Sequence, residues 1–488
     1  MVFVPLVAGA YEAQSLIANA QRCINLYAEK NQDDSPYPFT YYPTPGLKFL
    51  KANPGSSAAS RCLYTATNGN LYRVIGDKVY YVDSSFTHQL LGSIGTSSGI
   101  CSMVDNGLVV VLVDGSTAGY AIDLASNGFT TIAPSNFYGA DRVQYLDAYF
   151  LFNRPGTQQF YISLALVSYS QLMTGTAFDP LDFAAKVGYA DPLVTLSVVH
   201  REIWLIGALT TEVWYNSGST DFTYEQLPGA FVEHGCVAKY SVAEHDLAVF
   251  WLHKDKQGQG MVLRGSQYVA ERISTNAIEV ALSSYSRIDD AIGFVYQQNG
   301  HVFYVLTFPT ADATWVYDES QGIWHERAYL DTNGVMHAVK FNCVAAAYGK
   351  IVVGDKDSGT LYQLDLNTFL DLESPIARVR SWAHLVDEDK RVTYKGFQAK
   401  MEVGTDDGSL DSTSSTNPPQ VFLRWSDDGG KTFGNGIAQS LGALGQYRTD
   451  LQWNRLGMAR DRVFELSWSI PTKTALVGAY VDPEPFET

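Results

Sequence analysis

The sequence has few charged residues, and basic residues are the scarcer kind. Only 17% of the 488 residues are charged, against roughly 25% in an ordinary soluble chain. Acidic side chains outnumber basic ones by 51 to 34, which gives a formal net charge of −17 and a pI near 4.9. A protein with this balance does not hold DNA by a general basic surface.

Paired cysteines are also missing. The sequence contains no C-x-x-C motif, which excludes the common zinc-knuckle and thiol redox patterns. The odd number of cysteines argues against a complete disulfide framework, so we expect reduced and mostly buried thiols. The five cysteines are Cys23, Cys62, Cys101, Cys236 and Cys343.

Long apolar runs and long helical patterns are scarce. Residues 1–11 lack a basic region and are too short and too soon interrupted for a signal peptide or a membrane span. We therefore expect a soluble protein made in the cytosol. Short helices are expected only over residues 10–21 and 167–173.

Short aliphatic and aromatic strands separated by turns dominate the rest of the sequence. Hydrophobic residues reach 46% and aromatic residues 13%, which is enough for a large core. A loose turn–strand–turn–strand unit recurs, and its clearest copy is residues 70–83. Seven copies begin about 36 to 55 residues apart, which brackets the spacing of four-stranded propeller blades. One blade cannot bury its two apolar faces alone, whereas radial stacking buries both. The pattern predicts an all-β protein with a β-propeller of six or seven blades.

The residue composition of the sequence changes near Leu370. Charged and Gly/Ser/Thr-rich loops then separate strands expected at 392–403, 420–425, 446–453 and 462–469. We assign residues 1–375 to the propeller, with an N-terminal segment that closes the ring, and residues 376–488 to an antiparallel β-sandwich. The sandwich segment has 13 basic and 15 acidic residues, a net charge of −2. The first 375 residues have 21 basic and 36 acidic residues, so the acidity belongs to the propeller.

Three short motifs resemble catalytic or metal sites in their amino-acid pattern but lack the features that such sites need. Residues 95–99 match G-x-S-x-G around Ser97, but a strand rather than the required helix is expected afterwards. Residues 233–236 combine Glu, His and Cys, but neighbouring strand residues point to opposite faces. Residues 355–359 resemble the start of a calcium loop, yet Leu366 stands where the pattern needs a glutamate. We interpret all three as ordinary loops and expect no enzymatic activity, no metal and no cofactor.

One motif after residue 376 is specific. Ser426, Asp428, Gly430, Thr432 and Phe433 match the Asp-box pattern S-x-D-x-G-x-T-[W/F]. The Asp carboxylate and the two hydroxyls can bridge the backbone of a tight hairpin, and the aromatic ring can pack beneath it. We expect this hairpin to be structural.

Three arginines lie close together further along the same segment. Arg455, Arg460 and Arg462 could meet an acidic partner on a protein interface. The alternative is a solvated sheet edge protected by charge.

Several stretches together resemble the packaged-DNA stabilisation proteins of short-tailed phages, also called tail hub or tail accessory proteins. They follow one another along nearly the whole chain and are residues 23–29, 41–47, 235–241, 249–252, 274–279, 424–433 and 455–466.

The resemblance implies a structural virion protein of the phage tail, made in the host cytoplasm. Such a protein would form a homohexameric ring below the portal and adaptor proteins and extend the DNA channel. Tail needle or plug proteins and tailspikes or fibres would bind below it. The packaged DNA would lie in the channel without sequence-specific binding, which suits an acidic wall. The family offers no catalytic residues to assign.

A glycan-binding or sialidase-like propeller is the alternative function. The many aromatic side chains suit stacking on sugars. A sialidase would also need an arginine cluster and a Tyr–Glu pair inside the propeller. The sequence alone leaves this alternative open.

Overall fold

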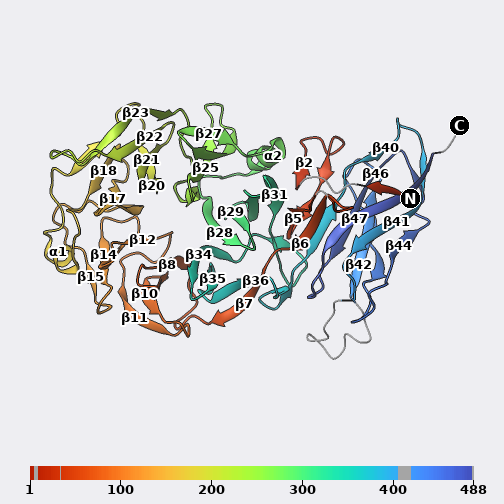
Figure 1. Ribbon diagram of the computed structural model, residues 1–488, viewed down its shortest axis with the longest axis horizontal. Coiled ribbons are helices and arrows are strands. Elements are labelled where there is room, and N and C mark those ends of the chain that lie inside the picture. The colour runs from red at the N-terminus through yellow and green to blue at the C-terminus, as the bar shows by residue number, and fades with distance from the viewer. Residues whose placement is uncertain (5–8, 33, 405–418, 486–488) are drawn as a thin grey trace.

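The computed structural model describes residues 1–4, 9–32, 34–404 and 419–485. A ring of β-sheets occupies one end of the molecule and a two-sheet sandwich the other (Figure 1). The all-β prediction, a propeller followed by a sandwich, is confirmed.

Six blades of the propeller are four-stranded antiparallel sheets built from consecutive strands. These are β8–β11 (Ser60–Thr65, Leu71–Ile75, Lys78–Val82, His88–Ser93), β12–β15 (Ser102–Asp105, Val109–Val113, Gly119–Asp123, Phe129–Thr131), β16–β19 (Val143–Leu146, Tyr149–Asn153, Gln159–Ile162, Phe183–Ala185), β20–β23 (Leu193–Val199, Glu202–Gly207, Thr211–Asn216, Tyr224–Val232), β24–β27 (Ala243–His245, Ala248–Lys254, Gly260–Ser266, Val269–Arg272) and β28–β31 (Ile292–Gln298, His301–Phe308, Ala313–Asp318, Ile323–Glu326).

A further four-stranded sheet closes the ring and is composite. It contains β34 (Phe341–Ala347), β35 (Lys350–Asp355) and β36 (Leu361–Asp365), and its outer strand is β7 (Gly46–Lys51) from near the N-terminus. β7 pairs antiparallel with β36, and the inner strand β34 contacts both β28 and β8. The ends of the propeller sequence are thus joined by hydrogen bonds, which leaves no open ring edge.

The residues of β13 explain why such sheets stack. All five side chains of Val109–Val113 are buried. Successive side chains of a strand point to opposite faces, and here the two faces belong to different hydrophobic clusters. Val109, Val111 and Val113 pack towards Phe150 of the next blade, whereas the two residues between them pack towards the preceding blade. A strand buried on both faces needs such an uninterrupted apolar run, here rich in β-branched valine.

The sandwich consists of two sheets. The first contains β1 (Val2–Val4), β5 (Leu26–Lys30), β6 (Phe39–Pro43), β41 (Val392–Met401), β44 (Leu451–Asn454), β45 (Met458–Ala459) and β47 (Leu476–Pro485). The second contains β4 (Cys23–Ile24), β39 (Arg378–Ser381), β40 (Leu385–Val386), β42 (Gln420–Ser426), β43 (Ile437–Ser440) and β46 (Asp461–Trp468). Their facing side chains form one core around Phe397, Trp453 and Phe464.

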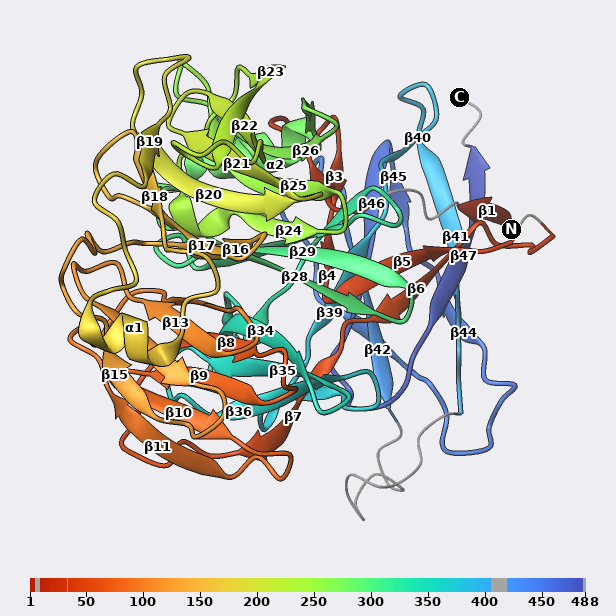
Figure 2. The ribbon, with the colours of Figure 1, turned by 60° about the vertical axis from the view of Figure 1, so that its left-hand side comes forward.

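The N-terminal strands join the two parts of the molecule. β1 and β6 pair with β47 of the sandwich, whereas β7 pairs with the last blade. β4 pairs with β31 of the propeller on one side and with β39 of the sandwich on the other, and Figure 2 shows β4 close to β39. Strands β1, β5 and β6 therefore complete the sandwich by strand pairing. The boundary between residues 375 and 376 stays a prediction.

Short elements fill the connections. They are β2 (Tyr11–Glu12), β3 (Ala20–Gln21), β32 (Tyr329–Leu330), β33 (Met336–His337), β37 (Leu370–Asp371), β38 (Ser374–Pro375), α1 (Tyr169–Thr174), α2 (Asn276–Ser284) and the 3-10 turn η1 (Lys239–Ser241). The helix expected over 167–173 is found as α1, whereas α2 lies where the sequence predicts only strands and turns. The helix expected over 10–21 is wrong, because β2 and β3 form a small hairpin there. Backbone groups of that segment bond to distant strands, as when the amide of Ala10 donates to the carbonyl of Trp324.

Asn25 joins three segments where the sandwich meets the propeller. Its side-chain amide donates to the carbonyls of Ala328 and Ala377, both at 2.8 Å, and its Oδ1 accepts from the amide of Ala328 at 2.9 Å. Asn25 is buried and has a φ of 55°. A single side chain thus bonds the N-terminal segment to the end of a blade and to the connector.

A buried histidine–aspartate pair lies beside this junction. His301 Nδ1 lies 2.7 Å from Asp318 Oδ2, and the ring of Tyr27 from β5 lies 5.1 Å from the His301 ring. The hydrogen bond with Asp318 raises the pKa of His301 above its usual 6.5. The neighbouring His325 is neutral, because burial lowers its pKa to about 3.

Replacing His301 with glutamine is expected to change the pH dependence of stability. Because the pKa of His301 is higher in the folded than in the unfolded chain, its stabilisation is complete below about pH 6.5 and declines as the pH rises through the folded pKa. The wild type should therefore lose its advantage over His301→Gln as the pH rises above about 6.5 and through the folded pKa. Urea unfolding of both chains across this range measures the difference. Parallel pH profiles would contradict the assignment.

Candidate functional site

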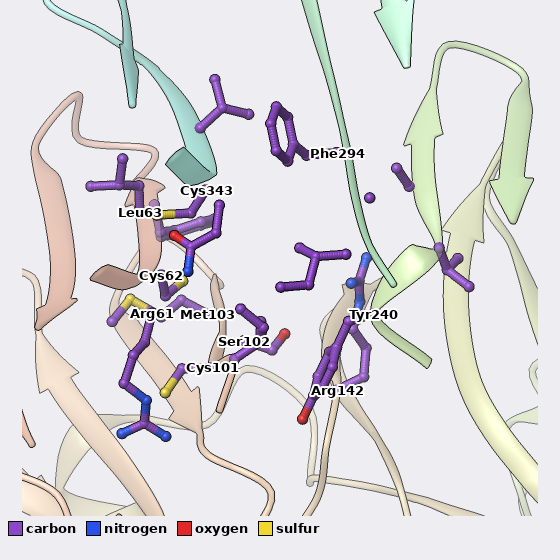
Figure 3. A pocket seen from close by; sticks show the side chains of 18 of the residues that line it. Arg61, Cys62, Leu63, Cys101, Ser102, Met103, Arg142, Tyr240, Phe294 and Cys343 are labelled. Atoms are coloured by element: carbon purple, nitrogen blue, oxygen red, sulfur yellow. The ribbon is translucent and has the colours of Figure 1, made fainter. Parts of the chain in front are cut away.

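The inner strands of the propeller surround a cavity of about 420 Å³. Side chains from β8, β12, β16, β24, β28 and β34 line it, and Figure 3 shows them converging from different blades. This central cavity is where a propeller enzyme or receptor would place its ligand.

Three thiols line the cavity but are poorly suited to reaction. Burial raises the pKa of Cys101 and of Cys343 to about 12, and it raises the pKa of Cys62 well above 9.0. These thiols are protonated at neutral pH, whereas metal binding and nucleophilic attack need the thiolate. All five cysteines of the chain are free, and four are buried, as expected. Among the described residues, no group of three or more His, Cys, Asp and Glu side chains could hold a metal ion.

The polar residues of the cavity include the types that a sialidase uses, but most are engaged elsewhere. Arg61 is buried and donates to the carbonyls of Gly76, Thr96, Ser98 and Gly99 over 2.6 to 2.9 Å. Glu244 accepts from Gln144 and from Ser197, and Tyr240 lies beside Lys239. Among the described residues that line the cavity, the hydrogen bonds give no Tyr–Glu pair; the Tyr268 hydroxyl does donate to Glu202 Oε1, but neither residue lines the cavity. The arrangement does not support the sialidase alternative.

The hydrogen bonds of Arg61 also show what the segment that matches the G-x-S-x-G motif does. The loop at 95–99 wraps around this guanidinium with its carbonyls turned inwards, and β12 follows it. The loop is therefore structural, and its carbonyls bind the side chain of Arg61.

The other two motif-like segments are also local structure. Cys236 Sγ lies 3.0 Å from the carbonyl of Ala238, and His234 Nδ1 lies 3.4 Å from His253 Nε2. Asp355 Oδ1 accepts from the amides of Asp357 and Ser358, both at 2.7 Å, which is the hydrogen bonding of an Asx turn.

The Asp-box residues form a bridged turn after β42. Asp428 Oδ1 accepts from the Ser426 hydroxyl at 2.6 Å and from the Thr432 amide at 2.9 Å, and the Gly430 amide donates to Ser426 Oγ at 2.9 Å. These hydrogen bonds lower the pKa of the Asp428 carboxyl well below its usual range, so it stays ionised. The Arg424 guanidinium lies 5.0 Å above the Phe433 ring. The turn is held by its own side chains, and its role beyond that stays a prediction.

The three arginines expected at an interface differ in their surroundings. Arg462 is 1% exposed, donates to both carboxylate oxygens of Asp427 at 2.6 and 2.7 Å, and lies over the rings of Tyr394 and Trp425. Arg462 is therefore occupied within the chain and is not offered to a partner. Arg460 is exposed and pairs with Asp389, and Arg455 is also exposed. The interface prediction now rests on Arg455 and Arg460.

Sequence reasoning missed the buried arginines as a class. Fully buried arginines occur in both the propeller and the sandwich, and they are Arg61, Arg73, Arg327, Arg378, Arg380 and Arg462. Each donates to at least one backbone carbonyl. Arg327, Arg380 and Arg462 also lie over aromatic rings. The available sequence signal was an arginine inside an apolar strand, as in Leu71–Ile75.

Comparisons with known proteins agree with this structural reading. A family model described as bacteriophage P22 Gp10, β-propeller, matches residues 2–369, and one described as bacteriophage P22 Gp10, β-sandwich, matches residues 377–484. No curated protein sequence matches the chain. The crystal structure of the WD40 β-propeller domain of Doa1 aligns with 10% identity and a TM-score of 0.39, over 65% of this chain and 96% of that one.

No described helix is long and apolar enough to span a membrane. The two family models together account for the propeller and the sandwich, and the resemblance found in the sequence is confirmed. The chain belongs to the bacteriophage P22 Gp10 family of packaged-DNA stabilisation proteins and is a phage structural protein.

Proposed function

We propose that this chain is a tail hub and head-completion protein that forms a homohexameric ring. The ring would bind below the portal and adaptor, extend the DNA channel and keep the packaged DNA in the head. It would carry the tail needle or plug and the tailspikes or fibres. The observation that carries the proposal is that the P22 Gp10 family models match both parts of the chain, over residues 2–369 and 377–484.

The charge of the chain supports a channel role. A surface along which DNA slides should repel phosphate rather than bind it. The first 375 residues carry a net charge of −15 and the rest −2. We propose that the propeller lies near the DNA and that the nearly neutral sandwich forms protein contacts. We also propose that the chain is made in the host cytoplasm, has no cofactor and catalyses no reaction.

The proposal is tested with phage particles assembled without this chain. Such particles should lose their DNA, and adding the purified chain should restore the amount of DNA that resists nuclease. Cryo-electron microscopy of the restored particles should then show a ring below the adaptor. Restoration without a ring, or hydrolysis of a sialoside by the pure chain, would contradict the proposal.

Serine at positions 455 and 460 should weaken attachment to such particles. Both arginines are exposed, so Arg455→Ser with Arg460→Ser should leave the fold intact while attachment falls by about tenfold. A matched control is Lys254→Ser with Lys256→Ser, which removes two exposed charges from the propeller. Attachment is measured by co-sedimentation at low salt. Equal binding of the two variants would remove the arginines from the interface.

A further inference from the structure

A segment of the propeller that contains β19 and the loop after it exposes a mainly apolar surface. Between residues 181 and 192, every exposed position is apolar, glycine or tyrosine. Leu181 is 76% exposed, Val187 72%, Tyr189 46% and Phe183 42%. We call Leu181, Phe183, Val187 and Tyr189 the propeller patch. Contiguous exposed apolar residues of this kind mark interaction surfaces in soluble proteins.

Two of the three charged residues of this segment are turned inwards, whereas Asp182 is partly exposed. Lys186 and Asp191 are buried, and Lys186 Nζ pairs with an Asp191 carboxylate oxygen and lies 2.5 Å from Thr210 Oγ1. Asp191 Oδ2 also accepts from the amide of Leu209 at 2.7 Å. A buried ion pair contributes little net stability but fixes geometry. Here it removes both charges from the surface and holds the propeller patch in place.

A second hydrogen bond fixes the tip of the same loop. The amide of Gly188 donates to Glu212 Oε1 at 2.7 Å, and Glu212 is itself buried. The loop is therefore ordered before any partner binds, so binding would not have to order it.

The sandwich has an apolar groove at the other end of the molecule. The groove has a volume of about 310 Å³ and lies among β1, β40, β41 and β47. Val2 and Val386, which line it, are 61% and 55% exposed. Strands β18 and β23 lie at one end of the longest axis and β40 and β47 at the other (Figure 1), and Figure 2 also separates β19 from β40.

We propose that the propeller patch of one copy of this chain docks on the sandwich groove of the next copy. The proposal rests on the ring of the proposed function. A head-to-tail ring requires two different surfaces that face different neighbours, and these two surfaces lie at opposite ends of the chain. Each copy carries a net charge of −17, so contact through mainly apolar surfaces meets less local repulsion. Asp182 in the patch segment and Asp387 in the groove lining are the acidic residues of the two surfaces.

Engineered cysteines test this contact, because a disulfide forms only when two Cα atoms approach within about 7 Å. One chain carries Val187→Cys and another carries Val386→Cys, and both are added together to particles assembled without the chain. After oxidation, the mixture should give disulfide-linked dimers at least tenfold more abundant than either variant alone. The control replaces Val386→Cys with Val335→Cys, which is 51% exposed outside both surfaces. The wild type controls for the five native cysteines.

The other outcomes are distinguishable. Dimers from Val187→Cys alone would indicate a symmetric contact and overturn the head-to-tail arrangement. A ring seen by cryo-electron microscopy without cross-links would overturn these surfaces but leave the proposed function standing. Absence of any ring would overturn both. Flotation of the chain with phosphatidylglycerol vesicles, abolished by Val187→Ser, would assign the propeller patch to a membrane instead.

Discussion

Replacing Asn25 with alanine is expected to lower the free energy of unfolding by about 3–6 kcal/mol. The substitution removes three hydrogen bonds that link the N-terminal segment to the end of a blade and to the connector. It leaves the carbonyls of Ala328 and Ala377 and the amide of Ala328 without these partners. It also places a residue with a Cβ but no local polar group at a φ of 55°, which alanine rarely adopts.

Two further variants separate these causes. Asn25→Gly keeps the backbone conformation and loses only the hydrogen bonds, so it should recover about 1 kcal/mol relative to alanine. Asn25→Asp places a carboxylate oxygen against two carbonyls and should be at least as destabilising as alanine.

Differential scanning calorimetry measures these effects at the level of the two domains. Because Asn25 bonds to both sides of the junction, its loss should separate one unfolding transition into two. If Asn25→Ala and the wild type both unfold in a single transition, with free energies of unfolding that agree within about 1 kcal/mol, the junction does not depend on this residue.

The propeller could be predicted because each of its strands is marked by an apolar run within its own few residues. The apolar run Val109–Val113 forms a strand, since a run buried on both faces needs no information from elsewhere. The number of blades was not predictable in the same way. The closing blade takes its fourth strand from residues 46–51, about 300 residues before β36, and no local period reveals such a pairing.

The failed helix at 10–21 shows the limit of local preference. Its Ala, Gln and Leu residues favour a helix, but its backbone and side-chain groups accept hydrogen bonds from a distant strand. The carbonyl of Ala20 accepts from Ser381, and Gln21 Oε1 accepts from Arg380. These partners lie about 360 residues away, so tertiary contacts decide the conformation.

Residues 23–29, one of the stretches that carry the family resemblance, have a structural role in this chain. Asn25 sits at the centre of that stretch and joins the two parts of the molecule. A buried asparagine with a positive φ cannot be told from a loop asparagine by sequence alone, because both favour the left-handed region.

Arg462 was interpreted from the sequence as a surface cation, although a signal for its burial was present. In β46, Arg462 shares one face of the strand with Phe464, Leu466 and Trp468, since side chains alternate. That face lies in the sandwich core. An arginine in register with three apolar residues is better explained as a buried residue with a specific partner than as a charge on a sheet edge.

The second large effect is therefore expected from Arg462→Ala, which should destabilise the chain by about 3–5 kcal/mol. The substitution leaves the carbonyl of Leu456 without its donor and opens a cavity beside the rings of Tyr394 and Trp425. It also releases Asp427, which adjoins the Asp-box turn.

Arg460→Ala is the matched control. It changes the same residue type two positions earlier, but the Arg460 side chain is exposed whereas that of Arg462 is buried. The Arg460 side chain is 54% exposed, against 2% for Arg462, and its removal should change stability by no more than about 0.5 kcal/mol. Arg462→Lys should lie between the two, because lysine keeps the charge but loses the bidentate pairing and the stacking. Urea unfolding followed by tryptophan fluorescence reports the sandwich through Trp425, Trp453 and Trp468. If Arg462→Ala and Arg460→Ala unfold at the same urea concentration, Arg462 does not stabilise the sandwich core.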